Sequence, residues 1–452
     1  MQSRQRKSQG AQGMTRRDVL RAGAGAAAGA AVGPFVLRVA GAGEAFNWQR
    51  FKGSKIYVLF TKHPWNDTIE RLLPEFEQLT GIKVDYTDLP EIQARQKATV
   101  EFTAGSGGVD AWYSSLLIEK RRFWKAGWYL DLSKFLKDPT MTAPDYDWDD
   151  MAAGAKQSVL QTDGTISGLP SFVDPFIFFY RKDLFAQKGL QPPRTLAELE
   201  EFAQHFHNPP TLYGFVARGL KNANAPPWDW VLFSMGGNFM TKDGKASINT
   251  PEAVKAMDWY AGMLRRFAPP GVVNFNWYEC SAAFMQGQVA MYFDGVNFAG
   301  QFEDKEKSKI PGKVGYAVLP AGPGGHFPPM FTSAVAVSPQ SKNQGAAYFL
   351  AQWATNKQNA VQQLLSGVGT ARTAVWSNPE VRAKAKMPAD WLQAYVDSLK
   401  IGRLGLPEIV GVTEYRDIIG VAIQKAIEGA KSQDVLNQAQ KEFQEVLDKT
   451  EK

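Results

Sequence analysis

Residues 54–113 run SKIYVLFTKHPWNDTIERLLPEFEQLTGIKVDYTDLPEIQARQKATVEFTAGSGGVDAWY, and their pattern indicates the fold class. Short apolar runs predict strands, and apolar residues at helical spacing predict helices. The predicted order is a strand at 55–60, a helix over 69–79 ending at Gly81, a strand at 82–86, a helix at 91–104 and a strand at 109–113. Pro74 predicts a kink or a later start in the first helix. This alternation indicates a parallel sheet with right-handed crossovers.

The ends of these strands are the first candidate binding loops. In open α/β sheets, ligands bind beyond the carboxyl ends of the strands. His63, Trp65 and Asn66 follow the first predicted strand, and Trp112 and Tyr113 end the third. We therefore expect these residues near a ligand.

The rest of the chain continues the alternation of strands and helices. Thr195 and Glu198 have the spacing of a capping box, which predicts a helix start. The remaining predicted elements are an apolar strand at 173–180, a Pro/Gly-rich loop at 319–325, a strand at 333–338, a long helix at 345–363 and a helical tail from 415 to 452.

Composition and length narrow the class of protein. The chain has 452 residues, of which 44% are hydrophobic and 12% aromatic, so disorder and collagen-like repeats are excluded. Cys280 is the single cysteine, which excludes an intrachain disulfide. A chain of this length is too long for one ordinary core, so we expect two lobes.

The net charge of +6 arises from the N-terminal segment. Residues 1–42 hold seven basic side chains and one acid, Asp18, which leaves 44 of each sign in the remaining 410 residues. A nucleic-acid-binding protein keeps a basic surface after such a subtraction. We therefore expect no nucleic-acid partner.

Residues 1–42 are predicted to be a Tat-type signal peptide. Arg16 and Arg17 precede a mildly apolar Ala/Gly stretch, and Ala40-Gly41-Ala42 offers small residues for cleavage. The alternatives are a basic, Ala-rich N-terminus or a membrane anchor, and Pro34 and Arg38 disfavour the anchor. The expected location is the periplasm, as a soluble product, because no other stretch approaches membrane-spanning length.

Motifs for catalysis or metal binding are missing from the sequence. There is no G-x-S-x-G elbow, P-loop, G-x-G-x-x-G or HExxH. His205 and His207 are two residues apart, which places them on different faces of a helix. Residues 145–149 imitate a calcium loop, but Asp150 stands where glycine is needed. The prediction is therefore no metal, no cofactor and no catalytic residue.

Aromatic residues beside polar ones suggest a sugar site instead. Sugar rings have apolar faces and hydroxyl rims, so their sites combine a flat aromatic with carboxylates or amides. The predicted stacking platforms are Trp228, Trp277 and Tyr278, with Asp174, Asp229, Asn276 and Asp294 as partners for hydroxyl groups. Each aromatic has the alternative role of a core anchor.

Several motifs, in this order, resemble the extracellular solute-binding proteins of carbohydrate ABC transporters, the group that includes maltose-binding protein. Gly108, Arg181 and Thr370 depart from the family pattern. The matching segments are PEFE at 74–77 with TGIKV at 80–84, VD at 109–110, GLP at 168–170, FYRKDLF at 179–185, FMQGQVAM at 284–291, DG at 294–295, AVS at 336–338 and GVGTAR at 367–372.

The resemblance implies an α/β, two-lobe periplasmic binding protein fold of type II, with a mainly parallel, helix-flanked sheet in each lobe and a hinge between lobes. Lobe 1 would comprise 43–173 and 318–372, and lobe 2 would comprise 174–317 and 373–452. The segments that line the cleft in relatives hold Trp65, Trp112, Asp174, Trp228, Trp277, Asp294, Gly295, Arg372 and Tyr415.

The implied function is the periplasmic, substrate-binding component of an ABC importer. It would bind a saccharide or polyol by aromatic stacking and hydrogen bonds, and deliver it as a monomer to permease subunits in the inner membrane. Two alternatives stay open: a binding protein for a polyamine or sugar phosphate, and an exported carbohydrate-active enzyme.

Overall fold

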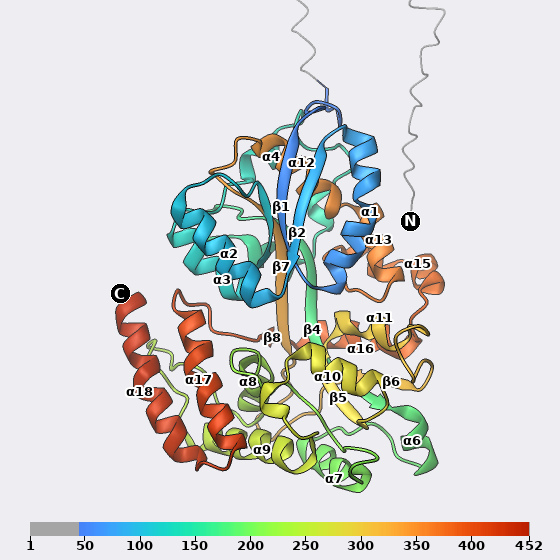
Figure 1. The fold of residues 1–452 in the computed structure, drawn as a ribbon, viewed down its shortest axis with the longest axis vertical. Helices are drawn as coiled ribbons and strands as arrows, with labels where there is room; N and C mark the ends of the chain where they lie inside the picture. Colours follow the sequence, from blue (N-terminus) through green and yellow to red (C-terminus); the bar gives the residue numbers. More distant parts are fainter. Residues whose placement is uncertain (1–44, 452) are drawn as a thin grey trace, which may run out of the picture. The chain divides into compact units, whose positions relative to one another are not determined.

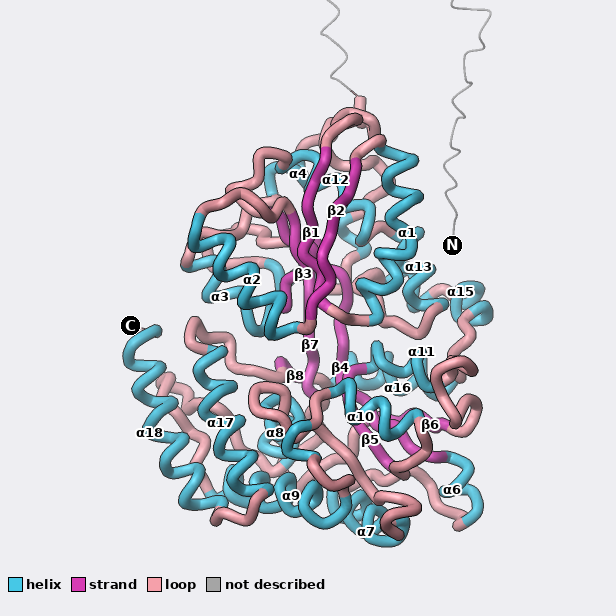
Figure 2. Tube along the Cα trace, in the orientation of Figure 1, coloured by secondary structure: helices cyan, strands magenta, loops and turns pink. Residues whose placement is uncertain are grey.

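The computed structural model describes residues 45–451 (Figure 1). The predicted signal peptide at 1–42 lies outside the described residues. The strands form one eight-stranded sheet in the order β2-β1-β3-β7-β4-β5, with β6 beside β4 and β8 beside β7. Figure 2 shows β4 and β7 passing from an upper group of elements to a lower group.

Residues 54–113 form the first three strands of the upper lobe. β1 (Lys55–Thr61) pairs in parallel with β2 (Lys83–Leu89) and with β3 (Ala111–Ser115), which confirms the parallel sheet predicted for this stretch. Between the strands run α1 (Pro64–Thr80) and α2 (Glu91–Ala104).

The first helix begins earlier than predicted and continues through Pro74. The Nδ1 of His63 caps its N-terminus by accepting the Trp65 N–H at 3.1 Å, and Pro64 occupies the first turn, where its missing N–H costs nothing. Gly81 ends the helix with a φ of 71° and donates its N–H to the Glu77 carbonyl at 2.8 Å.

The lower lobe corrects the expectation of a mainly parallel sheet in each lobe. β4 (Leu169–Arg181) pairs antiparallel with β5 (Met291–Gly295), with β6 (Val314–Val318) and with β7 (Pro329–Val337). The pairing is antiparallel because β4 descends between the lobes while β7 returns, and β8 (Arg403–Leu404) extends β7 at its start. Among the described residues, parallel pairing in the lower lobe is limited to β8 beside β7 and to isolated bridges such as Tyr213 with Val289.

The remaining helices cover the sheet (Figure 1). The upper lobe has α3 (Leu116–Lys125), α4 (Ser133–Lys137), α5 (Ala153–Val159) and α12 (Gln344–Ala354). The helices α13 (Lys357–Leu365), α14 (Thr373–Ser377) and α15 (Pro379–Lys384) follow in the chain. The lower lobe has α6 (Lys182–Gln187), α7 (Leu196–Phe206), α8 (Ala225–Ser234), α9 (Pro251–Phe267), α10 (Trp277–Met285), α11 (Ala299–Phe302), α16 (Ala389–Ile401), α17 (Val412–Ile427) and α18 (Ser432–Thr450). Short 3-10 turns lie at Trp148–Asp150, Val272–Asn274 and Val296–Phe298.

Local side-chain hydrogen bonds change two predicted helices. The helix predicted at 345–363 is divided into α12 and α13, because the Asn356 side chain accepts the Asn359 N–H at 2.8 Å and starts a new helix. Thr195 caps α7 as predicted, but the Glu198 carboxylate accepts the N–H of Arg194 at 2.7 Å instead of completing the box.

Buried apolar side chains form separate clusters in the two lobes. The upper cluster surrounds β1, α1 and α12, and the lower cluster surrounds α8, α9, α17 and β5. The exact lobe boundaries stay a prediction.

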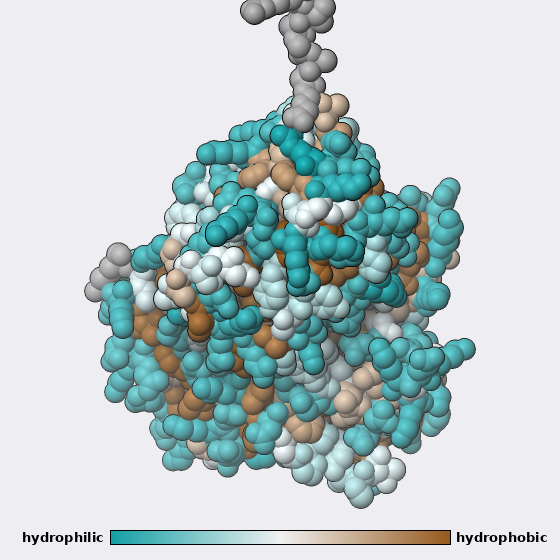
Figure 3. Space-filling view, turned by 45° about the horizontal axis from the view of Figure 1, so that its top comes forward, coloured by the Kyte–Doolittle hydropathy of each residue, from teal (hydrophilic) through white to brown (hydrophobic). Residues whose placement is uncertain are grey.

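No helix within residues 45–451 is long and apolar enough to span a membrane. The face in Figure 3 is mainly hydrophilic, with separate hydrophobic patches.

Candidate functional site

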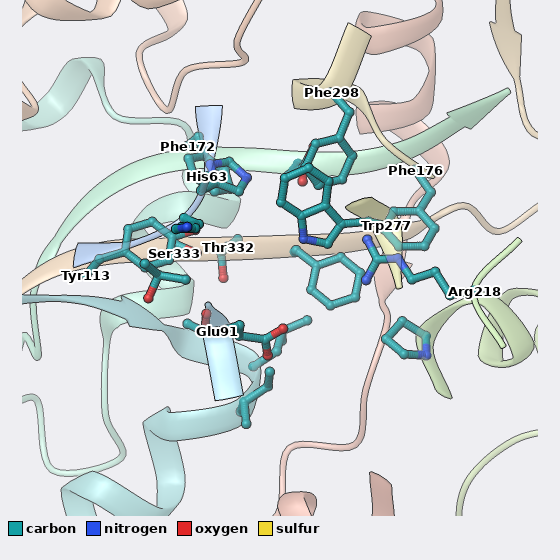
Figure 4. Close-up of a pocket in the computed structure, with 18 of the residues that line it drawn as sticks. His63, Glu91, Tyr113, Phe172, Phe176, Arg218, Trp277, Phe298, Thr332 and Ser333 are labelled. Carbon is teal, nitrogen blue, oxygen red and sulfur yellow. The ribbon is translucent and has the colours of Figure 1, made fainter. Parts of the chain in front are cut away.

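A small pocket lies where the two lobes meet, and both contribute side chains to it. It encloses about 80 Å³. Two pairs of stacked aromatic rings line it, and the ring of His63 meets that of Phe298 edge to face, with centroids 5.8 Å apart; charged and hydroxyl groups complete the lining (Figure 4). The pocket is lined by Thr61, Lys62, His63, Glu91, Tyr113, Ser115, Leu117, Ile118, Phe172, Asp174, Phe176, Arg218, Pro226, Trp277, Phe298, Phe331, Thr332, Ser333 and Arg416.

His63 and Phe172 form the wall that comes from the upper lobe and β4. Their rings are stacked, with centroids 4.8 Å apart and planes 10° apart. Burial, and then the charge of Arg218, lower the pKa of His63 to about 3, so the imidazole is neutral. Since its Nδ1 accepts the Trp65 N–H, the proton belongs on Nε2, which is free to donate to a ligand oxygen.

Trp277 and Phe298 form the wall that comes from the lower lobe. The two rings are stacked at 4.4 Å and 15°, and Tyr278 lies on Trp277 at 3.7 Å. Trp277 begins α10, whose first turn is fixed by a capping box between Asn276 and Glu279. The cap therefore holds the indole in place, while Asn276 itself does not line the pocket.

Asp294 and Arg218 form a buried ion pair beneath this wall. The Arg218 Nε donates to Asp294 Oδ2 at 2.8 Å, and its Nη2 donates to Oδ1. Tyr292 OH and the Gly295 N–H also donate to Asp294, at 2.7 and 2.8 Å. Burial alone would lower the pKa of Arg218, but Asp294 outweighs burial and raises it.

Asp174, on β4, presents a second carboxyl group to the pocket. Burial raises its pKa to about 8, although the Asn297 N–H donates to Oδ1 at 3.2 Å; the charge of Asp294 adds to the rise. A Cβ at Gly295 would lie 2.4 Å from Asp174 Oδ2, so only glycine fits there. At neutral pH the Asp174 carboxyl is mainly protonated and offers both a donor and an acceptor.

Glu91 and Arg416 form a further charged pair in the pocket. Arg416 Nη1 lies 3.2 Å from Glu91 Oε1, and Arg95 Nη2 lies 2.5 Å from the same oxygen. Burial would raise the pKa of Glu91, but the charges of Arg416 and Arg95 lower it to about 2. The Thr332 hydroxyl, also at the pocket, is buried with no hydrogen-bond partner among residues 45–451.

The protonated Asp174 predicts a pH dependence of stability. Its pKa is about 8 in the folded chain and 3.8 without burial, so folding holds a proton that unfolding releases. Its stabilising contribution is complete below pH 3.8 and is lost as the pH rises through 8. Asp174→Asn stays neutral, so its melting temperature relative to wild type should rise between about pH 4 and about pH 8 in thermal unfolding and stay level above that. An unchanged difference would mean that Asp174 is ionised in the folded chain.

Four of the sequence-predicted site residues line the pocket: His63, Tyr113, Asp174 and Trp277. Six others lie behind these residues and support them. Trp65 packs near Tyr113, and the Asn66 side chain donates to the Thr61 carbonyl. Asn276 and Tyr278 contact Trp277, Asp294 pairs with Arg218, and Gly295 lies against Asp174. Direct contact of these six residues with a ligand stays a prediction.

The structure places the other five predicted residues away from the pocket. Trp112 alternates with Tyr113 along β3, so it faces the opposite side and packs on Phe102 and Tyr129. Trp228 is fully buried in the lower core. Asp229 accepts the Tyr415 hydroxyl at 2.8 Å in that same core.

Arg372 is the fifth of these residues and has a structural role. Its Nε donates to the Thr355 carbonyl at 2.9 Å and its Nη1 to the Asp147 carbonyl at 2.7 Å. It therefore holds the loop after α12 against the loop that contains Asp147.

Sequence reasoning missed five prominent pocket residues: Glu91, Phe172, Arg218, Phe298 and Arg416. Two of them could have been predicted from the sequence, because Glu91 and Phe298 follow shortly after the ends of β2 and β5. Arg218 and Arg416 could not, since their partners are distant in the chain.

Among residues 45–451 no group of His, Cys, Asp and Glu side chains is arranged to hold a metal ion.

The chain is similar to known proteins over most of its length. The sequence profile of the bacterial extracellular solute-binding protein family matches residues 63–361. The erythritol/L-threitol-binding protein of Mycolicibacterium smegmatis is 26% identical over 388 residues, covering 78% of this chain and 80% of that protein. The mannitol-binding protein of Pseudomonas aeruginosa is 29% identical over 306 residues, covering 65% and 67%.

The fold is also similar to that of a solved structure. The ABC transporter solute-binding protein of Agrobacterium radiobacter K84, in complex with ribitol, matches with a TM-score of 0.80 and 27% identity, covering 87% of this chain and 99% of that one.

Proposed function

From the premise that the chain belongs to the family of bacterial extracellular solute-binding proteins, with their two-lobe type II fold, we propose that it binds a small, uncharged polyol in the pocket between its lobes. The observation that carries this proposal is the aromatic lining that comes from both lobes, with His63 and Phe172 as one wall and Trp277 and Phe298 as the other. Such walls suit the C–H surface of a polyol.

The polar groups between the walls support a polyhydroxylated ligand. His63 Nε2 is a neutral donor, and protonated Asp174 is both donor and acceptor. The buried Thr332 hydroxyl lacks a partner within the described chain, and a ligand hydroxyl would supply one. The relatives described above bind erythritol, L-threitol, mannitol and ribitol, by their names.

The pairing of the pocket arginines favours an uncharged ligand over a polyamine or sugar phosphate. The two pocket guanidiniums, Arg218 and Arg416, are each opposed by a carboxylate, from Asp294 and Glu91. An anionic ligand would have to compete with those carboxylates, and a cationic ligand would meet guanidiniums already paired. The enclosed volume of about 80 Å³ favours a short polyol over an oligosaccharide.

The same contacts favour binding without chemical change. A glycosidase needs two carboxyl groups that flank the scissile bond. Asp294 has its oxygens occupied by Arg218, Tyr292 and Gly295, so it is a poor candidate for a nucleophile.

We propose that residues 1–42 direct export by the Tat route to the periplasm, where the monomeric protein passes its ligand to the permease subunits of an ABC importer. The lobes would comprise 43–173 with 318–372 and 174–317 with 373–452.

Thermal unfolding with a panel of solutes tests the proposal. A ligand that binds only the folded chain must raise its melting temperature by mass action. We expect ribitol, mannitol or erythritol to do so and to be recovered unaltered, while maltose, putrescine and glucose 6-phosphate do not. A shift by a charged solute alone would contradict the polyol assignment, and consumption of a saccharide would favour the enzyme.

A further inference from the structure

Glu91 gathers guanidinium groups from both lobes around one carboxylate. It is the first residue of α2, which packs against β1 and β2 in the upper lobe. Arg95, one turn later on α2, pairs with it within that lobe. Arg416 reaches it from α17, which packs in the lower lobe against α8, α9 and α18. The Glu91–Arg416 pair therefore joins the two lobes across the pocket.

Both sides of this pair are held by further contacts. Arg416 is 3% exposed, and its Nε donates to the Asn222 carbonyl at 3.0 Å, which fixes the guanidinium to the lower lobe. Arg95 Nε lies 3.4 Å from Glu119, whose carboxylate accepts the Ser114 hydroxyl at 2.8 Å in the upper lobe. Each partner is thus held by a contact within its own lobe, and the geometry of the pair depends on how the lobes approach each other.

The negative charge of Glu91 makes it favourable for the two lobes to come together at this point. Arg416, Arg95 and Arg218 all act on its charge, and Arg95 and Arg218 in turn act on Arg416 as like charges. Without Glu91, guanidiniums of the lower lobe would face Arg95 of the upper lobe at close range. Like charges brought together out of water repel, and separating the lobes would return them to solvent.

We propose that Glu91 is a positioning residue that controls closure of the lobes: its pairing with Arg416 stabilises the closed arrangement in which the ligand is held. This inference rests on the proposed function for its ligand readout. It assigns Glu91 no contact with the polyol and no role in choosing it. For a ligand that binds only the closed arrangement, the affinity is proportional to the fraction of molecules whose lobes are closed.

The test compares Glu91→Gln with a matched control, Glu414→Gln. Glu414 lies 3.7 Å from Arg122, so it also joins the lobes, but both side chains are exposed, at 50% and 39%. We expect Glu91→Gln to weaken binding of the polyol found by thermal unfolding by about tenfold or more, mainly through faster dissociation. Glu414→Gln should change it by less than about threefold. Equal effects would overturn the proposal.

A double variant separates closure from a general loss of structure. In Glu91→Gln/Arg416→Gln no guanidinium at position 416 is left without a partner, so binding should be tighter than in Glu91→Gln alone. A double variant that binds no better than the single variant would contradict the pairing.

Small-angle X-ray scattering gives a readout that needs no ligand. The unliganded wild-type chain should have a smaller radius of gyration than Glu91→Gln, because the pair holds the lobes together. Equal radii would overturn the closure proposal even if a polyol binds. Failure of every polyol to bind, with the radii still different, would overturn the proposed function and leave the closure role supported.

Discussion

Asp294→Ala is expected to lower the free energy of unfolding by about 3–5 kcal/mol, because it leaves the buried Arg218 guanidinium without its carboxylate. Asp294 is fully buried and accepts hydrogen bonds from Arg218, Tyr292 and the Gly295 N–H. Removing it deprives all three donors at once, and an unpaired buried charge is among the most costly defects in a core.

Urea unfolding of the variant measures this effect. The matched control is Asp397→Ala, which removes a carboxylate 2.8 Å from Lys400 where the two side chains are 37% and 65% exposed. That control should change stability by less than about 1 kcal/mol. The double variant Asp294→Ala/Arg218→Met should recover much of the loss, since neither charge is then left alone. An Asp294→Ala chain as stable as the control would contradict the buried pair.

The second large effect separates two tryptophans that the sequence marks as equivalent platforms. Trp228 is fully buried in the lower core, so Trp228→Ala should cost about 3–5 kcal/mol of stability. Trp277 is partly exposed at the pocket wall, so Trp277→Ala should instead weaken polyol binding by about tenfold or more, a cost typical of a central aromatic contact.

Urea unfolding and calorimetric titration of both variants distinguish these roles. The expected pattern is a destabilised Trp228→Ala chain and a weakly binding Trp277→Ala chain whose stability stays closer to wild type. If Trp277→Ala binds the polyol as wild type does, Trp277 is not a stacking platform and the lower wall of the site is misplaced.

The local signals in the sequence account for much of the upper lobe. The run at 55–60, the helical spacing over 69–79 and the glycine at 81 act through neighbouring residues, so periodicity reveals them. The alternation of Trp112 and Tyr113 was visible as well, but the sequence does not say which face of β3 meets the pocket.

The charged part of the site depends on long-range contacts that no local pattern encodes. Asp294 pairs with Arg218 across 76 positions, and Glu91 pairs with Arg416 across 325. Each of these side chains alone resembles an ordinary surface charge. The same limit explains why Trp228 and Trp277 could not be separated, because burial in a core and exposure in a cleft are tertiary properties.

A crystal structure of the chain with the polyol that most raises its melting temperature tests the central claim most directly. We expect electron density for one ligand between the His63–Phe172 and Trp277–Phe298 walls. Its hydroxyl groups should lie within hydrogen-bond distance of Asp174, Thr332 and His63 Nε2. A pocket without ligand, or ligand bound only in a groove elsewhere on the surface, would contradict the claim.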